Sequence, residues 1–142
     1  MLLKVKLDKR EDGVVALILE GSIDTETYVG LKQKISSVIA MSPRVLIFDM
    51  EKVDYISSMG IGTVIETKKQ IELIGGHFMM TNLQPQVKKV FEIVETLPDL
   101  NMFESTEEAD EYLFRIQEQM KGKAAEKEIE KEEERGKKNK CD

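Results

Sequence analysis

Two adjacent serines, Ser57 and Ser58, lie where a loop is expected to become a helix, in the stretch VDYISSMGIGTVIETKK of residues 53–69. A serine nucleophile needs a general base, but no histidine is close in sequence and there is no Gly-x-Ser-x-Gly elbow. A serine here can instead cap the helix by accepting a hydrogen bond from a backbone amide. It can also carry a phosphate, because free amides and the helix dipole favour an anion at a helix start. The residues alone leave both roles open.

Two glycines follow the serines, Gly60 and Gly62. They leave the first turn of the expected helix almost without side chains, so that another protein could approach the backbone closely. Each glycine costs a helix about 1 kcal/mol relative to alanine. This cost indicates a reason in packing or in docking, and the sequence does not distinguish between the two.

The remaining candidates for chemistry are few. His77 is the only histidine and Cys141 the only cysteine, so neither has a partner for a metal site or a disulfide. The Gly-Ile-Gly of residues 60–62 lacks the third glycine of a dinucleotide fingerprint and the lysine of a phosphate-binding loop. We therefore expect no enzymatic activity, no cofactor and no metal.

The elements around the serines alternate between strands and helices. The pattern of residues 3–8 predicts a strand with one solvent-exposed face, and that of residues 14–20 predicts a strand buried on both faces. A hairpin turn is expected between them. Further strands are expected at residues 44–50, 77–82 and 100–104. Helices are expected from Asp24 or Thr25 to Ile39, from Ser58 to Gly75, around residues 87–94 and around residues 109–120. The pattern predicts an α/β fold: a single domain with a mixed four- to five-stranded sheet, parallel crossovers and about four helices.

The charge and hydropathy of the chain limit the classes of partner that it can bind. Residues 117–142 hold eight basic and eight acidic residues, so the net charge of -6 belongs to residues 1–116. An acidic body is a poor match for nucleic acid or anionic lipid, and the apolar runs are too short to cross a bilayer. We expect a cytoplasmic protein with its domain at residues 1–116. Residues 117–142 are expected to form a charged tail, either a helical extension or disordered.

Four segments resemble the STAS domains of bacterial anti-sigma-factor antagonists. Residues 46–65, LIFDMEKVDYISSMGIGTVI, are similar to the central motif of that family. Residues 19–35 resemble its Gly-x-hydrophobic-Asp segment, and residues 81–97 resemble its Asn-Leu-x-x-x-Val segment. With residues 103–113, which look like the closing helix, the resemblance covers residues 3 to about 116 and implies a single STAS-like domain.

The resemblance implies a phosphorylation switch. Such proteins bind a serine-kinase anti-sigma factor, are phosphorylated by it, and are restored by a serine phosphatase. Ser58 matches the phosphate acceptor, and Ser57 is the alternative. Asp24 matches an aspartate on the same face, and the motif adds four further partner-binding candidates, which are Met59, Gly60, Ile61 and Gly62. Two residues depart from the commonest form, since Ser57 replaces a frequent aspartate and Met59 a frequent small hydroxyl residue.

Asp24 can also cap the first helix, a role that Thr25 could equally well supply. Asp49 and Asp54 are expected to shape loops or cap helices. We expect a monomer or weak dimer that contacts neither nucleic acid nor membrane directly. Two alternatives stay open, a STAS subunit of a larger signalling assembly and a small-ligand-binding STAS module.

Overall fold

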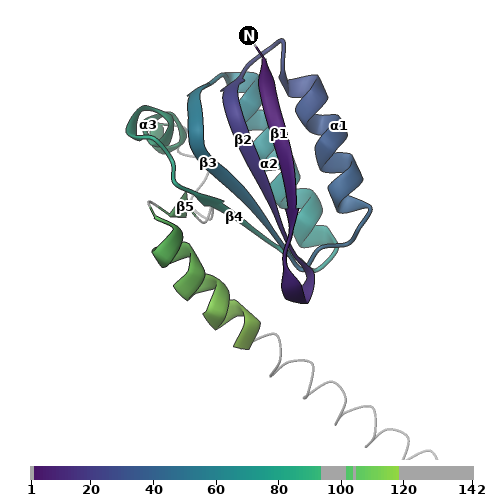
Figure 1. Cartoon of the computed structure of the whole chain (residues 1–142). Coiled ribbons are helices and arrows are strands. Elements are labelled where there is room, and N and C mark those ends of the chain that lie inside the picture. The colour runs from purple at the N-terminus through teal and green to yellow at the C-terminus, as the bar shows by residue number, and fades with distance from the viewer. Residues whose placement is uncertain (1, 94–101, 104, 119–142) are drawn as a thin grey trace, which may run out of the picture. The chain divides into compact units, whose positions relative to one another are not determined.

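The computed structural model describes residues 2–93, 102–103 and 105–118. The chain divides into two compact units, residues 1–106 and residues 107–142. The first unit contains a five-stranded mixed sheet (Figure 1) in the order β1-β2-β3-β4-β5. Its strands are β1 (Leu3–Lys9), β2 (Val14–Ile23), β3 (Val45–Ile56), β4 (His77–Thr81) and β5 (Met102–Phe103). The predicted α/β class and mixed sheet are confirmed.

The two N-terminal strands form the predicted hairpin. β1 pairs antiparallel with β2, from Leu3 opposite Gly21 to Lys9 opposite Val15. A short 3-10 turn (Glu11–Gly13) connects them, and Gly13 has a φ of 75°. This left-handed backbone suits glycine, which has no Cβ to clash.

The other strand pairs are parallel, and helices connect them. The helices are α1 (Tyr28–Ile39), α2 (Ser58–Leu73) and α3 (Pro85–Ile93). Because the strands follow one another across the sheet, right-handed crossovers place α1 and α2 on the same face. Figure 1 shows these two helices together behind the sheet. Gly75, at φ 81°, ends α2 close to the predicted position.

The core lies between this face and the helices. Its members are buried apolar residues at strand or helix spacing, which include Leu17, Leu19, Leu46, Phe48, Phe78 and Met80 of the strands and Leu31, Ile35, Ile61, Val64, Val87 and Phe91 of the helices. The opposite face of the sheet is also buried at Ala16, Ile47 and Met79. The near-continuous apolar runs of these strands are typical of strands covered on both sides.

The second unit is described only as far as residue 118. A helix spans residues 106–118, and its buried positions Ala109 and Ile116 lie on the apolar stripe that the sequence predicts. Val94 and Met120, also assigned to helical stripes, lie outside the described residues, as does most of the predicted tail. The domain boundary at residue 116 therefore stays a prediction. None of the described helices is long and apolar enough to cross a bilayer.

We predict that Phe48→Ala destabilises the fold by about 3–5 kcal/mol, because the change leaves a cavity in the core. The Phe48 ring is fully buried and meets the Phe78 ring edge to face, with centroids 4.9 Å apart. Urea unfolding followed by circular dichroism measures the loss. Leu73→Ala is the control, since Leu73 is 85% exposed and its truncation should change the stability by less than about 0.5 kcal/mol. Equal losses in the two variants would contradict the assignment of the core.

Candidate functional site

Ser57 is the N-cap of α2. Its backbone is extended, and its Oγ accepts a hydrogen bond from the Gly60 amide at 3.2 Å. This bond satisfies one of the amides that a helix start leaves without a partner inside the helix. The capping role that the sequence left open for the serine pair therefore belongs to Ser57.

Ser58 is the first residue of α2, and its side chain is exposed. Its hydroxyl makes no hydrogen bond to any residue that the structure describes. It lies at the positive end of the helix dipole, where negative charge is stabilised. A modifying enzyme can therefore reach the Ser58 hydroxyl without unfolding the domain.

The geometry offers the serines no histidine base. His77 opens β4 and pairs with Val45 at the start of β3, whereas Ser57 follows the end of β3. These positions are opposite ends of the sheet. Among the residues described, no group of three His, Cys, Asp or Glu side chains is placed to hold a metal ion.

The two glycines of the motif have different surroundings. A Cβ on Gly60 would lie 2.7 Å from Ile23 Cγ2, 2.7 Å from Ile56 Cγ1 and 2.9 Å from the Ile23 carbonyl oxygen. A Cβ on Gly62 would meet nothing within 4 Å. Packing therefore explains the glycine at position 60, because it lets α2 approach the ends of β2 and β3. Packing does not explain Gly62, which leaves an exposed first turn with no side chain at that position.

The remaining motif residues also differ in exposure. Ile61 is 6% exposed and belongs to the core, whereas Met59 is 42% exposed beside Ser58. Gly60 and Ile61 therefore shape the surface from beneath, and Ser58, Met59 and Gly62 form it. The partner-binding role of each residue stays a prediction.

Strand pairing brings Asp24 to the same end of the sheet as the serines. Ile23 pairs with Ile56 at the ends of β2 and β3, and the Ser57 amide donates to the Ile23 carbonyl at 2.8 Å. Asp24 and Ser57 are thus the next residues along two neighbouring parallel strands. The structure confirms that these two segments meet.

The Asp24 side chain organises the turn before α1. Its Oδ1 accepts hydrogen bonds from the amides of Glu26 at 2.9 Å and Thr27 at 3.0 Å, and from the Thr27 hydroxyl at 3.3 Å. The Glu26 bond first, and then those from Thr27, lower the pKa of Asp24 from its ordinary value. Because Asp24 holds this turn, the α-helix begins only at Tyr28, later than the predicted start at Asp24 or Thr25.

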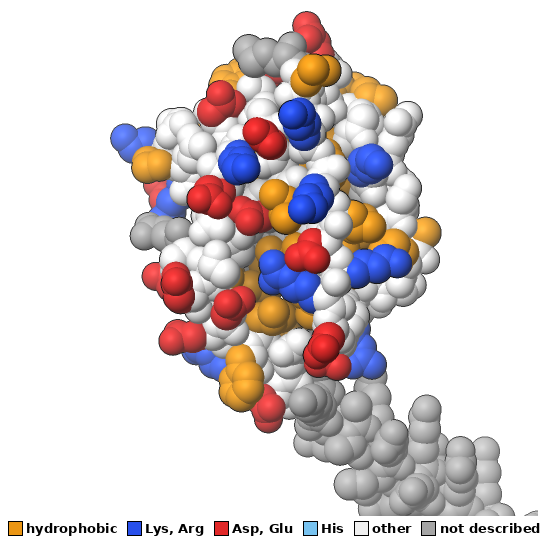
Figure 2. Space-filling view, in the orientation of Figure 1, with side chains coloured by type: hydrophobic (Ala, Val, Ile, Leu, Met, Phe, Trp, Pro, Cys, Tyr) orange, Lys and Arg blue, Asp and Glu red, His pale blue; other side chains and the backbone are white. Residues whose placement is uncertain are grey.

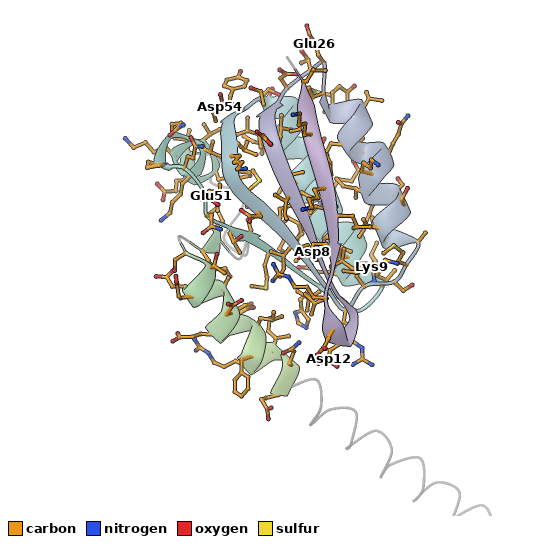
Figure 3. All side chains as sticks on the ribbon, in the orientation of Figure 1. Asp8, Lys9, Asp12, Glu26, Glu51 and Asp54 are labelled. Carbon is orange, nitrogen blue, oxygen red and sulfur yellow. The ribbon has the colours of Figure 1, made fainter. Side chains whose placement is uncertain are left out.

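Two outward residues near the end of β3 add to this surface. Asp54 accepts a hydrogen bond from the buried Ser22 hydroxyl at 3.0 Å, and Tyr55 is 54% exposed. Figure 3 shows Asp54 and Glu26 at the same end of the molecule. Tyr55 was not among the predicted site residues, and its signal in the sequence is an aromatic residue directly before the Ile-Ser-Ser motif.

Asp49 lies within β3, not in the loop or helix cap that the sequence suggested. Its Oδ1 accepts from the Glu51 amide at 3.1 Å and from Asn82 Nδ2 at 3.3 Å. On the face shown in Figure 2, acidic and basic side chains are interspersed.

The family model and the relatives that match this chain point to the same family. The family model for the STAS domain matches residues 6–109. BtrV of Bordetella bronchiseptica, a candidate anti-sigma factor antagonist, is 30% identical over 91 residues, which are 64% of this chain and 78% of BtrV. The anti-sigma F factor antagonist of Lysinibacillus sphaericus is 27% identical over 109 residues, 76% of this chain and 90% of that protein.

A solved structure agrees with these relatives. The anti-sigma factor antagonist SpoIIAA in its unphosphorylated form has a TM-score of 0.66 and 25% identity, over 78% of this chain and 96% of SpoIIAA. The SpoIIAA of Bacillus has also been solved in a phosphorylated form, with 24% identity, a TM-score of 0.61, and coverage of 78% of this chain and 99% of that chain.

We predict opposite effects on stability for alanine at the two glycines. Gly60→Ala should lose about 1–3 kcal/mol, because the new methyl group overpacks against Ile23 and Ile56. Gly62→Ala should gain about 0.5–1 kcal/mol, because it adds helix propensity without a clash. Paired urea titrations compare the two variants, and changes of the same sign would contradict the packing role of Gly60.

We also predict that the pKa of Asp24 lies below its ordinary value of 3.8 in the folded protein. Because the folded-state pKa is depressed, the contribution of Asp24 to stability is present above the pKa of the unfolded chain. It is lost as the pH falls through the folded-state value. Carboxyl carbon NMR measures the titration directly.

Thr27→Val is the matched variant for this titration. It removes the Thr27 hydroxyl, which also donates to the Ser22 carbonyl at 2.8 Å and accepts from the Asp24 amide at 2.9 Å. The amide donors of Glu26 and Thr27 remain, so the pKa of Asp24 should move only part of the way back to 3.8. A wild-type value at or above 3.8 would contradict the hydrogen-bonded turn.

Proposed function

This chain belongs to the STAS domain family, and we propose that it is an anti-sigma-factor antagonist that phosphorylation of Ser58 switches off. In this proposal the unmodified protein binds a serine-kinase anti-sigma factor and releases the sigma factor for transcription. The kinase then phosphorylates Ser58, and a serine phosphatase restores the active form. The role is regulatory and cytoplasmic.

The observation that carries the proposal is the position of Ser58. Its exposed hydroxyl starts α2 beside the bare turn at Gly62. The names of the relatives and the two phosphorylation states of SpoIIAA support the same role. A partner that covers Ser58 also reaches Met59 and Gly62, so one surface serves both recognition and modification.

The free domain can accommodate a phosphate on Ser58, whereas a complex with a partner cannot. A phosphate adds a charge of about -1.5 to -2. Within the free domain the start of α2 stabilises nearby negative charge by about 0.3–1 kcal/mol. In a complex the same charge enters a desolvated contact next to the Asp24 carboxylate, and juxtaposed like charges cost several kcal/mol there. The modification therefore releases the partner and leaves the fold intact.

Ser57 is the weaker acceptor for a structural reason. Its Oγ already accepts from the Gly60 amide. Loss of an N-cap hydrogen bond costs about 1 kcal/mol of stability, and a bulky group on this oxygen would disturb the cap. Ser58 has no such role.

The test begins with intact mass and phosphosite mapping of the protein purified from its own cells. We expect one phosphate in the wild type and in Ser57→Ala, and none in Ser58→Ala. Ser57→Ala is the matched control because it changes the neighbouring hydroxyl and keeps the acceptor. A phosphate that stays in Ser58→Ala, or a protein unphosphorylated under all growth conditions, would contradict the switch.

Affinity for the kinase that phosphorylates the wild type gives the second readout. Ser58→Ala should bind it constitutively, and Ser58→Asp should bind at least about tenfold more weakly, since about 1.4 kcal/mol corresponds to a factor of ten. Titration calorimetry in the presence of ATP analogue measures both. Equal affinities of the two variants would refute the charge mechanism.

A further inference from the structure

Among the residues that the structure describes, the sheet has one long edge without a partner strand. β1 pairs with β2 on one side in an unbroken register, and no described strand lies on its other side (Figure 1). The opposite edge strand, β5, is only two residues long. Proteins protect exposed edges with short strands, prolines, bulges or charged side chains. β1 has seven residues with no proline and no bulge against β2, and its charged residues are Lys4, Lys6, Asp8 and Lys9.

The free backbone groups of β1 can be identified from its pairing. The Arg10 amide donates to the Val14 carbonyl at 2.8 Å, which marks this position as a hydrogen-bonded pair. Such pairs alternate along an antiparallel ladder, so Lys4, Lys6 and Asp8 bond to β2. The residues between them direct their amides and carbonyls outward; these are Leu3, Val5, Leu7 and Lys9.

Apolar side chains accompany these outward backbone groups. Leu3 and Val5 pack partly against the core, and Leu7 is 44% exposed. An open groove of about 400 Å³ runs between β1 and α1, and its lining includes Val5, Leu31 and Gly30. A Cβ on Gly30 would meet nothing within 4 Å. The edge therefore combines unpaired backbone with an accessible apolar strip.

We propose that this edge binds a second copy of the chain, with β1 pairing antiparallel to β1 of the partner across a two-fold axis at Lys6. In this register Val5 faces the partner's Leu7, and Leu3 faces the partner's Lys9, in hydrogen-bonded pairs built from the outward backbone groups. Lys4 faces the partner's Asp8. Each contact occurs twice by symmetry, and the two sheets become one continuous sheet.

The identity of the occupant follows from self-complementarity. Lys4 and Asp8 lie two positions on either side of Lys6 on one face of the strand, so a two-fold axis at Lys6 places opposite charges together. Asp8 also contacts Arg10, with Nε and Oδ2 3.3 Å apart, but both side chains are more than 40% exposed and leave Asp8 open to a second cation. On the other face the same axis places Val5 against the partner's Leu7. An unrelated peptide has no reason to match both faces.

One contact opposes association and predicts a weak dimer. The axis places Lys6 against Lys6 of the partner, and like charges directly opposite each other are destabilising. Figure 3 places Asp8 and Lys9 near the hairpin end of the sheet, away from Glu26 and Asp54. Residues 57–62 are not part of the edge, so the dimer is independent of the proposed switch.

The first test is the mass of the full chain by light scattering over a range of concentrations. We expect the average mass to rise above the 16.2 kDa of one chain as the concentration reaches hundreds of micromolar. Val5→Pro removes an outward amide that β2 does not use, and prolines are tolerated at such edge positions. This variant should stay at the mass of one chain, with Val5→Thr as the folded control that keeps the amide. A wild type that remains at 16.2 kDa, or a dimer that survives Val5→Pro, would overturn the proposal.

A charge-reversal experiment tests the register without depending on how the proline variant folds. Wild type and Lys6→Glu are mixed in equal amounts and examined by native mass spectrometry. Exchange of a repulsive pair for an attractive one at the axis should enrich the mixed dimer about fivefold over the statistical distribution. A statistical distribution would show that residue 6 does not face its own copy and would overturn the register.

Discussion

The close approach of Gly60 to Ile23 is the contact on which the arrangement of the site depends. Two parallel strands end together at Ile23 and Ile56, and α2 must begin within one residue of that end. Any side chain at position 60 would collide with both isoleucines and with the Ile23 carbonyl oxygen. The glycine therefore fixes where α2 starts, and through it where Ser57 caps and where Ser58 is exposed. The Ser57 amide donates a hydrogen bond to the Ile23 carbonyl, and this backbone contact stabilises the same junction between the ends of β2 and β3 and the start of α2.

The junction also explains how two loops far apart in sequence share one surface. The carboxyl ends of parallel strands meet at one edge of a sheet, and ligand sites of α/β folds gather there. The β2–α1 turn is held by Asp24, whose carboxylate is kept ionised by the amides around it. The start of α2 is held by Ser57. Each loop thus satisfies part of its own backbone, and the Ser58 hydroxyl stays exposed beside them.

Much of this could be predicted from the sequence because the relevant signals are local. Apolar periodicity located the helices and strands, and the Ser-Ser-x-Gly-x-Gly spacing located the helix start. Tertiary contacts decided the rest. The first-turn glycines look alike in sequence, but only Gly60 meets Ile23 and Ile56, which are distant along the chain or in the preceding strand. The later start of α1 at Tyr28 depends on which amides Asp24 binds, and propensity does not specify that choice. Tyr55 follows a register shift in β3, where Val53 pairs with Gly21 and Tyr55 with Ser22, so that Asp54 is left without a partner in the ladder.

The packing of the junction bears on what kind of switch the proposed phosphorylation of Ser58 would be. A conformational switch requires an element with two arrangements that differ by a few kcal/mol. Here the residues beneath the first turn, Gly60 and Ile61, are buried against strand ends, and a shift of α2 would break contacts across the core. A phosphate on Ser58 instead extends into solvent at a helix end that favours negative charge. In the proposed switch the phosphate changes the surface charge and not the backbone conformation. It can therefore alter the affinity of a partner only if the partner contacts Ser58. This requirement makes the exposed side chains around the serine, Met59 and Tyr55 with the bare turn at Gly62, the surface on which recognition must depend.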